Sequence, residues 1–191
     1  MSTHPGAGMQ ADLVHRAVLG DRDAFASLAE AAVDRCYAIA FRILRDPQRA
    51  QDATQQALIG AWRDLPSLRE ADRFEAWLYR LVVHACYAEG RRNRRWTGTI
   101  GLIPTDRSTS PDPASSIVDR DELERGFRRL SPEHRAVIVL HHYAGYPLTE
   151  IALTLGVPVG TVRSRLHYAT GQLRAAIEAD ARSLSPEERP A

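Results

Sequence analysis

Two groups of arginine residues carry the chemistry that this sequence suggests. Between Val157 and Ile177 there are three arginines and no acidic residue, and between Arg80 and Trp96 there are five arginines against Glu89 alone. A guanidinium group donates hydrogen bonds from a rigid fork that matches phosphate oxygens and the acceptor edge of guanine. Because the formal net charge is only +1, these local excesses indicate particular faces that bind a polyanion.

The first group lies in a segment that predicts two short helices joined by a sharp turn, from Leu148 to Leu173. Gly156 can supply the left-handed residue that ends a helix, and Pro158 suits the first turn of the next one. After the turn, a buried stripe is predicted from apolar residues at steps of three or four: Val162, Leu166, Ala169, Leu173 and Ile177. Five side chains lie away from the centre of that stripe: Thr161, Arg163, Ser164, His167 and Tyr168. The pattern predicts a helix-turn-helix motif that reads DNA, the alternative being a helical hairpin in an all-α core.

The second group begins inside a predicted helix that combines aromatic rings with positive charge. An inward stripe is predicted from apolar residues: Phe74, Trp77, Leu78, Leu81 and Ala85. On another face, Arg80, His84, Tyr87 and Arg91 recur at spacings of four, three and four. Bases stack on rings while guanidinium groups bind phosphates, so this face suits single-stranded nucleic acid. The alternative is a solvated basic face with an exposed tyrosine.

Composition limits the class of protein. A chain of 191 residues with 44% hydrophobic residues can form one large or two small folded domains. No run of 18 apolar residues exists, and the first eleven residues lack a signal-peptide pattern. We expect a cytoplasmic protein with no membrane partner.

Several enzyme classes are excluded by residues that the chain lacks. All 25 basic residues are arginine, so a P-loop lysine, a pyridoxal Schiff base and a lysine base are impossible. Cys36 and Cys86 lie fifty residues apart in apolar helical patterns, which predicts buried, reduced thiols. The histidines at 134, 141 and 142 lack a completing carboxylate or cysteine. We therefore expect no metal, no cofactor and no enzymatic activity.

Helical periodicity divides the chain into two halves. In the first, helices are predicted over 12–20, from a cap at Asp21 or Asp23 to Asp46, over 48–65, and from about 72 onward. Residues 97–121 contain three prolines and many serines and threonines without helical period, which predicts a flexible linker. Helical pattern resumes at about 122, with Ser131 as an N-cap and Pro132 in the first turn.

The predicted fold class is therefore all-α, with two small helical domains joined by a flexible linker. The expected boundaries are a disordered tail over 1–10, a first domain over 11–96, the linker over 97–121, a second domain over 122–178 and a tail over 179–191.

Taken together, the two halves resemble the extracytoplasmic-function sigma factors, a group of small bacterial transcription-initiation factors, over about residues 12–178. The first half matches in Ala50-Gln51-Asp52, in RFEAWLYRLV at 73–82 and in the arginine run from Arg91 to Arg95. The second half matches more tightly, in LSPEHRAVIVLHHYAGYPLTEIALTLGVPVGTVRSRLH at 130–167. The string PVGTVRSRL at 158–166 is the most specific part.

The resemblance implies a sigma region 2-like domain that binds core RNA polymerase and the minus-ten promoter element, and a region 4-like domain that binds the minus-thirty-five element. It places the helix over 48–65 on the clamp of the large polymerase subunit, with three polar contact residues: Asp52, Gln55 and Gln56. It places the minus-ten element on one surface: Trp77, Arg80, His84, Tyr87, Arg91, Arg92, Arg94 and Arg95. Within the second domain it assigns base contacts to Arg163, Ser164, His167 and Tyr168, and phosphate contacts to Thr161 and Arg165.

The chain departs from the usual family pattern at several positions. Gln51 and Gln56 replace frequent acidic residues, and Ala53 replaces a larger apolar residue. His84 stands where asparagine is common, and Ala88 where aspartate is common. Tyr168 and Thr170 occupy two frequent arginine positions. We expect the first set of differences, together with Gly60 in a helix interior, to weaken polymerase contact. Because of the others, promoter preference cannot be carried over from a relative.

Our main hypothesis is a dissociable specificity subunit of RNA polymerase that recognises and melts a promoter. An anti-sigma protein is a partner of many such factors, although no residue here names one. One alternative is a repressor or activator with a helical sensing or dimerising domain, which a palindromic site and a stable dimer would favour. Another is a helical enzyme or metal-dependent module that uses the histidines.

Overall fold

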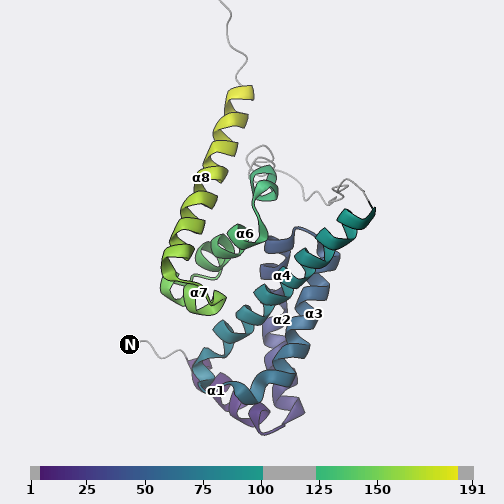
Figure 1. Cartoon of the computed structure of the whole chain (residues 1–191). Helices are drawn as coiled ribbons and strands as arrows, with labels where there is room; N and C mark the ends of the chain where they lie inside the picture. Colours follow the sequence, from purple (N-terminus) through teal and green to yellow (C-terminus); the bar gives the residue numbers. More distant parts are fainter. Residues whose placement is uncertain (1–4, 101–123, 185–191) are drawn as a thin grey trace, which may run out of the picture. The chain divides into compact units, whose positions relative to one another are not determined.

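The structure, a computed structural model, describes residues 5–100 and 124–184, and the side chains of 8–92 and 124–178. Every regular element within these ranges is helical, which confirms the predicted all-α class (Figure 1). The chain divides into two compact units, one built mainly from α1 to α4 and the other mainly from the helices after residue 123. Each unit is described by itself.

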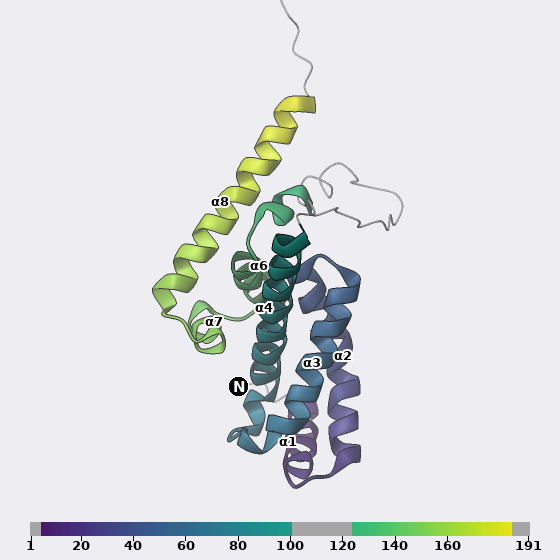
Figure 2. The ribbon, with the colours of Figure 1, turned by 45° about the vertical axis from the view of Figure 1, so that its right-hand side comes forward.

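The first unit consists of α1 (Pro5–Val18), α2 (Arg22–Leu44), α3 (Pro47–Asp64) and α4 (Phe74–Ile100). Two short 3₁₀ turns, Leu65–Ser67 and Ala71–Arg73, connect α3 to α4. Helices α2, α3 and α4 lie side by side and pack on one another (Figures 1 and 2).

Aspartate caps define where α2 and α3 begin. The Asp21 carboxylate accepts hydrogen bonds from the backbone N–H groups of Asp23 and Ala24, each at 3.0 Å. The Asp46 carboxylate accepts one from the Arg49 N–H at 2.9 Å, with proline in the first turn of α3. Such caps satisfy N–H groups that have no partner within the helix. Asp21 was one of two residues predicted for this role, and Asp46-Pro47 was predicted as the break.

In the core of the first unit, large apolar side chains of α2 and α4 pack against α3, whose buried side chains are small. Ile39 and Ile43 of α2 and Leu78 and Val82 of α4 are fully buried. The buried residues of α3 are mostly small: Ala50, Ala53, Thr54, Ala57 and Ala61. Small side chains let neighbouring helix backbones approach closely, so α3 lies against both α2 and α4.

The second unit contains a short helix over 124–129, α6 (Pro132–Ile138), a π-helical turn (Val139–Tyr143), α7 (Leu148–Leu155) and α8 (Val159–Leu184). Ser131 caps α6 as predicted, since its hydroxyl accepts from the His134 N–H. Gly156 ends α7 with a φ of 65°. Pro158 precedes α8 rather than lying in its first turn, and its carbonyl accepts from the Val162 N–H.

The predicted stripe of α8 is buried except at its end. Val162, Ala169 and Leu173 are buried, and Leu166 is half-buried. Ile177 is 40% exposed while its neighbour Ala176 is buried. The prediction for Ile177 was wrong because a straight α-helix drifts relative to a strict four-residue step.

Three helices extend beyond the predicted boundaries. α1 begins at Pro5, within the predicted tail over 1–10. α4 continues to Ile100, four residues into the predicted linker, and α8 continues to Leu184. The rest of the predicted linker lies outside the described residues. Among the described residues, no helix is both long and apolar enough to cross a membrane.

Candidate nucleic-acid interface

The exposed side of α8 carries the residues predicted to meet duplex DNA. Arg163, Ser164, His167 and Tyr168 are exposed, whereas Thr161 and Arg165 are half-buried. The assignment of base contacts and phosphate contacts among these residues stays a prediction. The Ser164 hydroxyl donates to the Thr161 carbonyl at 3.0 Å, so base contact by Ser164 requires its hydroxyl to be shared or turned.

The Tyr168 ring packs against a residue of α6. Its ring lies 4.7 Å from that of His134, centroid to centroid, at an interplanar angle of 40°. Nδ1 of His134 is in turn 2.8 Å from the Ser131 hydroxyl. Tyr168 still has 53% of its surface exposed, so it packs on its own unit and remains available to a ligand.

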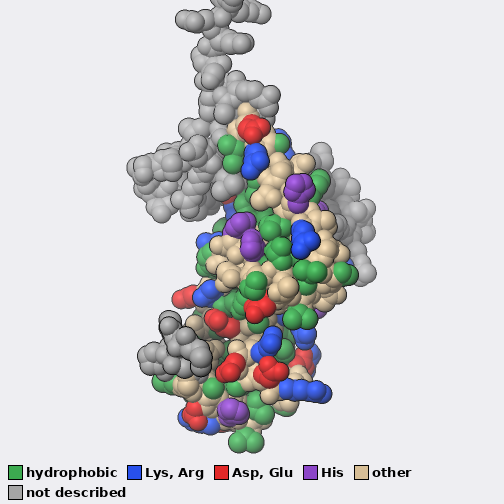
Figure 3. All heavy atoms as spheres, turned by 90° about the vertical axis from the view of Figure 1, so that its left-hand side faces the viewer, with side chains coloured by type: hydrophobic (Ala, Val, Ile, Leu, Met, Phe, Trp, Pro, Cys, Tyr) green, Lys and Arg blue, Asp and Glu red, His purple; other side chains and the backbone are tan. Residues whose placement is uncertain are grey.

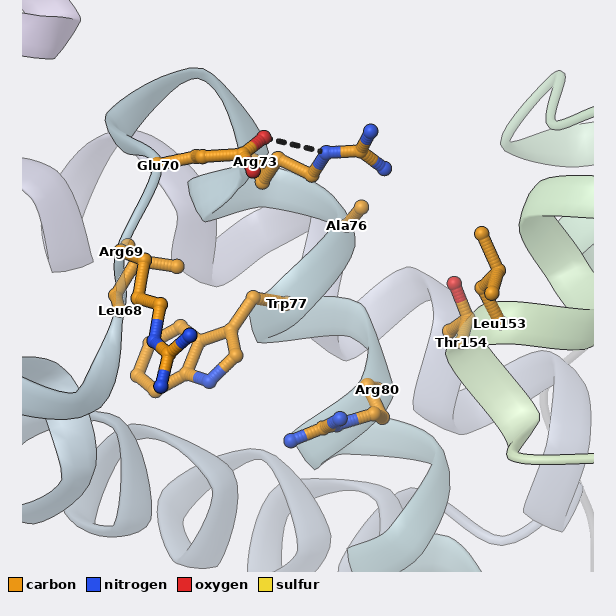
Figure 4. A pocket seen from close by; sticks show the side chains of 9 residues that line it. All are labelled: Leu68, Arg69, Glu70, Arg73, Ala76, Trp77, Arg80, Leu153 and Thr154. Atoms are coloured by element: carbon orange, nitrogen blue, oxygen red, sulfur yellow. Dashed lines mark hydrogen bonds and ion pairs between the residues drawn. The ribbon is translucent and has the colours of Figure 1, made fainter.

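The α4 surface combines exposed charge with half-buried rings. Arg80, His84 and Arg91 are exposed, while Trp77 and Tyr87 are half-buried. Trp77 packs near Phe74, with ring centroids 6.1 Å apart. Figure 4 shows the Trp77 and Arg80 side chains projecting to the same side of the helix.

Arg80 and Arg91 lie close enough to His84 on α4 to affect its protonation. The side chain of His84 is exposed overall, but partial removal of its ring from water lowers its pKa below the ordinary value of 6.5, and repulsion from Arg80 and Arg91 lowers it further. At neutral pH His84 is therefore mainly neutral between two cations. The field that lowers this pKa also attracts a phosphate.

Arg92, the second residue of the arginine run, has an acidic partner. The Arg92 guanidinium forms an ion pair with Glu89 at 3.1 Å, and the Glu89 side chain is only 10% exposed. Arg92 therefore neutralises a nearly buried carboxylate as well as facing solvent. The side chains of Arg94 and Arg95 lie outside the described residues. In Figure 3, arginine and histidine side chains lie at the surface among hydrophobic, acidic and neutral groups.

The polar residues predicted to contact polymerase lie on the outer side of α3. Gln55 and Gln56 are exposed, and Asp52 is half-buried. Nε2 of Gln48 donates to the Asp52 carboxylate at 3.3 Å.

A groove of about 800 Å³ lies beside these residues, between α2 and α3. Its lining includes Gln55 and three large apolar side chains that remain exposed: Tyr37 by 37%, Ile59 by 57% and Trp62 by 39%. Trp62 is steadied by Phe25, with ring centroids 5.0 Å apart. Apolar periodicity over 48–65 predicts Trp62 on the buried side of its helix, together with a stripe of alanines at 50, 53, 57 and 61, and for Trp62 this was wrong. Tyr37 and Ile59 were not predicted as site residues, although Ile59 falls outside the alanine stripe.

The cysteines and histidines form no candidate metal site in the described part of the chain. Cys36 and Cys86 are free and fully buried, as predicted, and burial raises the pKa of both thiols to about 12. The His141 ring is hydrogen-bonded through Nδ1 to the Tyr146 carbonyl at 3.0 Å. Both the thiols and this imidazole therefore have structural explanations.

Comparison with known proteins adds two family matches. Residues 28–96 match the model of sigma-70 region 2, and residues 126–175 match that of sigma-70 region 4. The chain is 34% identical to the ECF RNA polymerase sigma factor SigL of Mycobacterium tuberculosis over 169 residues, covering 84% of this chain and 95% of the relative. It is 30% identical to SigW of Bacillus subtilis over 167 residues, covering 81% and 89% respectively.

Two solved structures share the fold. The sigma factor RpoE of Bartonella quintana, solved with the anti-sigma factor NepR, matches with a TM-score of 0.68 and 23% identity over 82% of this chain and 98% of that one. CnrH, solved with the cytosolic domain of CnrY, matches with a TM-score of 0.63 and 23% identity over 90% of this chain and 98% of that one.

Proposed function

This chain belongs to the extracytoplasmic-function family of RNA polymerase sigma factors, and from that premise we propose which of its surfaces performs each part of promoter recognition. As a sigma factor, it binds core RNA polymerase and directs it to promoter DNA. The observation that carries the proposal is that each family region presents one helix with an exposed basic face, α4 in the first unit and α8 in the second.

We assign the minus-thirty-five element to α8. Arg163 is exposed near the start of the helix, and N-terminal residues of a recognition helix contact base edges in the major groove. Arg163, Ser164, His167 and Tyr168 would face bases, and Thr161 and Arg165 would bind phosphates.

The minus-ten element is assigned to α4. There Arg80 and Arg91 would bind phosphates of the non-template strand, and Trp77 and Tyr87 would offer ring surface to unstacked bases. Each stacked base is worth about 1–3 kcal/mol, which offsets part of the cost of opening the duplex. Arg94 and Arg95 continue this surface by sequence.

Polymerase binding is assigned to the groove between α2 and α3. Exposed Ile59 and Trp62 beside Gln55 form the apolar centre and polar edge that are typical of protein interfaces. Gln56 and Asp52 extend the polar edge. We propose the clamp of the large subunit as the element that binds there, and an anti-sigma protein as a competitor for sigma surfaces, since the structural neighbour from Bartonella quintana was solved with an anti-sigma factor.

In this proposal the chain contributes specificity and strand separation, and polymerase supplies all catalysis. It acts in the cytoplasm, where polymerase and promoter meet. The repressor alternative predicts tight binding to duplex DNA without polymerase, and the enzyme or metal-module alternative predicts turnover or retained metal.

A single experiment tests the assignment. Purified chain is mixed with core polymerase and a library of promoter fragments, and transcript start sites are mapped. We expect specific start sites that require both the chain and core polymerase. Duplex binding by the chain alone, without new transcripts, would instead support the repressor.

Arg163→Ala tests the α8 assignment. A well-placed arginine contact to a base is worth about 1–3 kcal/mol, so we expect promoter-specific transcription to fall by about fivefold or more while polymerase association is unchanged. Arg174→Ala, an exposed arginine three turns further along the same helix, is the matched control. Loss of polymerase association in Arg163→Ala would assign that residue a structural role.

A further inference from the structure

Tyr168 occupies a base-facing position on α8 with an aromatic ring in place of a flexible cation. Because its ring contacts His134 at 4.7 Å, one side of the ring is occupied by the protein. The residue keeps 53% of its surface exposed, so the side of Tyr168 that does not face His134 remains open to a ligand. Tyrosine has only two side-chain torsions, so a single such contact fixes its direction at low entropic cost.

His134 is itself held in place by the start of α6. The Ser131 hydroxyl oxygen accepts from the His134 backbone N–H at 3.4 Å and lies 2.8 Å from Nδ1 of the same residue. Because the hydroxyl oxygen accepts from the backbone N–H, the hydroxyl hydrogen can be donated to Nδ1. In the neutral ring Nδ1 is then the acceptor, and Nε2 carries the proton. Burial lowers the pKa of His134 below its ordinary value of 6.5, and the positive charge of Arg165 lowers it further against the opposing effect of Glu133. A neutral ring therefore packs against Tyr168.

From these contacts we infer that His134 is a positioning residue that holds the Tyr168 ring against the 5-methyl group of a thymine in the minus-thirty-five element. The inference rests on the proposed function, because it requires α8 to lie in the major groove. Thymine is the base that presents a methyl group there, and apolar side-chain contact is the way that proteins recognise it. An arginine at position 168 would instead seek guanine or phosphate, so this pair would shift promoter preference.

The test uses holoenzyme assembled from the full chain and core polymerase, on the promoter found by start-site mapping. Each thymine of the minus-thirty-five element is replaced in turn by deoxyuridine, which keeps base pairing and lacks only the methyl group. With the unmodified chain we expect one position to lose about fourfold in affinity, the equivalent of one buried methyl group.

Four variants separate positioning from general stability. Tyr168→Ala and His134→Ala should both reduce the thymine-to-deoxyuridine ratio at that position to about one. His134→Phe, which keeps a ring in place, should restore the ratio, and Tyr168→Phe should keep it. Each ratio compares two promoter fragments bound by the same variant, so a uniform loss of folded protein does not change the ratio.

Two results would overturn the inference. The first is that His134→Ala keeps the full ratio, which would show that Tyr168 does not depend on it. The second is that Tyr168→Phe alone abolishes affinity while deoxyuridine has no effect, which would assign the tyrosine hydroxyl to a phosphate. If Arg163→Ala also leaves minus-thirty-five recognition unchanged, the α8 assignment itself fails. If Arg163→Ala weakens recognition and the His134 variants do not change the ratio, only the present inference fails.

Discussion

Arg91 and Arg92 are neighbours on α4, but their guanidinium groups have different surroundings. Arg91 is exposed, whereas Arg92 pairs with the nearly buried Glu89 at 3.1 Å. Removing Arg91 should cost a phosphate contact. Removing Arg92 should also leave a buried carboxylate without this partner, which destabilises the fold.

We therefore predict that Arg91→Ala weakens open-complex formation and reduces the slope of log affinity against log salt by about 0.7, the value for one single-strand phosphate contact. Its unfolding midpoint should stay unchanged. Filter binding of a forked promoter fragment between low and moderate salt measures the slope. A defect that is the same at all salt concentrations would contradict a phosphate contact.

Arg92→Ala should differ by lowering the thermal unfolding midpoint of the first unit. The matched control is the double variant Arg92→Ala with Glu89→Gln, in which no buried charge remains. Calorimetry should show that the double variant recovers part of the lost stability. Equal stability of Arg92→Ala and the unmodified chain would show that the ion pair contributes nothing.

We predict that His84 makes minus-ten binding depend on pH. In the free protein, partial burial and the cations Arg80 and Arg91 hold the pKa of His84 below 6.5. A bound phosphate favours the protonated form and raises this pKa, so binding takes up a proton. Affinity should then increase as pH falls through the bound-state pKa and level off below the free-state pKa. A one-unit difference between the two pKa values corresponds to about a tenfold gain.

The measurement is affinity for single-stranded minus-ten DNA between pH 5 and 8. His84→Asn supplies the residue common in the family and cannot titrate, so its affinity should lose this dependence. If both proteins show the same pH profile, another group is responsible.

At the scale of elements, two glycines in helices have opposite surroundings. A Cβ atom at Gly60 of α3 would meet nothing within 4 Å. At Gly126, in the helix over 124–129, it would lie 3.0 Å from Leu173 Cδ2 and 3.2 Å from Ala176 Cβ. Gly60 therefore carries only the conformational cost of glycine in a helix, while Gly126 allows that helix to approach α8.

Gly60→Ala should stabilise the first unit by about 0.5–1 kcal/mol, because alanine is the better helix former. Gly126→Val should destabilise the second unit by about 1–3 kcal/mol through overpacking. Denaturant unfolding followed by circular dichroism measures both. A stabilising Gly126→Val would mean that Leu173 moves aside without cost.

Helix positions could be predicted from the sequence because local chemistry specifies them. Asp21, Asp46 and Ser131 cap helices that begin where their spacing predicts. Two other ends were misplaced, since α1 begins at Pro5 and α8 reaches Leu184. The available signals were Pro5 itself, which suits a first helical position, and Pro186, which follows two residues after Leu184.

The candidate site could be predicted where periodicity determines exposure, and less well where tertiary packing does. Arg163 and His167 follow directly from the α8 stripe. The α2–α3 groove does not, because Tyr37 and Ile59 belong to different helices and become neighbours of one hollow only after folding. The contact between His134 and Tyr168 likewise joins residues 34 positions apart.

At the scale of the whole molecule, sigma function requires weak contacts to act together. One unit is proposed to hold polymerase and single-stranded DNA, and the other duplex DNA. Each contact alone can be weak, because the chain between the units converts the second binding event into an intramolecular one. Such a factor can dissociate once transcription has started.

The length of the connecting segment is therefore the property to vary. If the predicted linker over 97–121 acts as a flexible tether beyond the end of α4, as its proline and serine content predicts, effective concentration falls with about the −3/2 power of length. Inserting Gly/Ser residues that double the segment should lower promoter affinity by only about threefold. It should also widen tolerance to the spacing between the two promoter elements.

Transcription from promoters with altered spacing measures both effects, with binding to core polymerase alone as the control. Complete loss of promoter recognition, with polymerase binding intact, would mean that the segment itself makes a specific contact, because a passive tether of twice the length still spans the two elements.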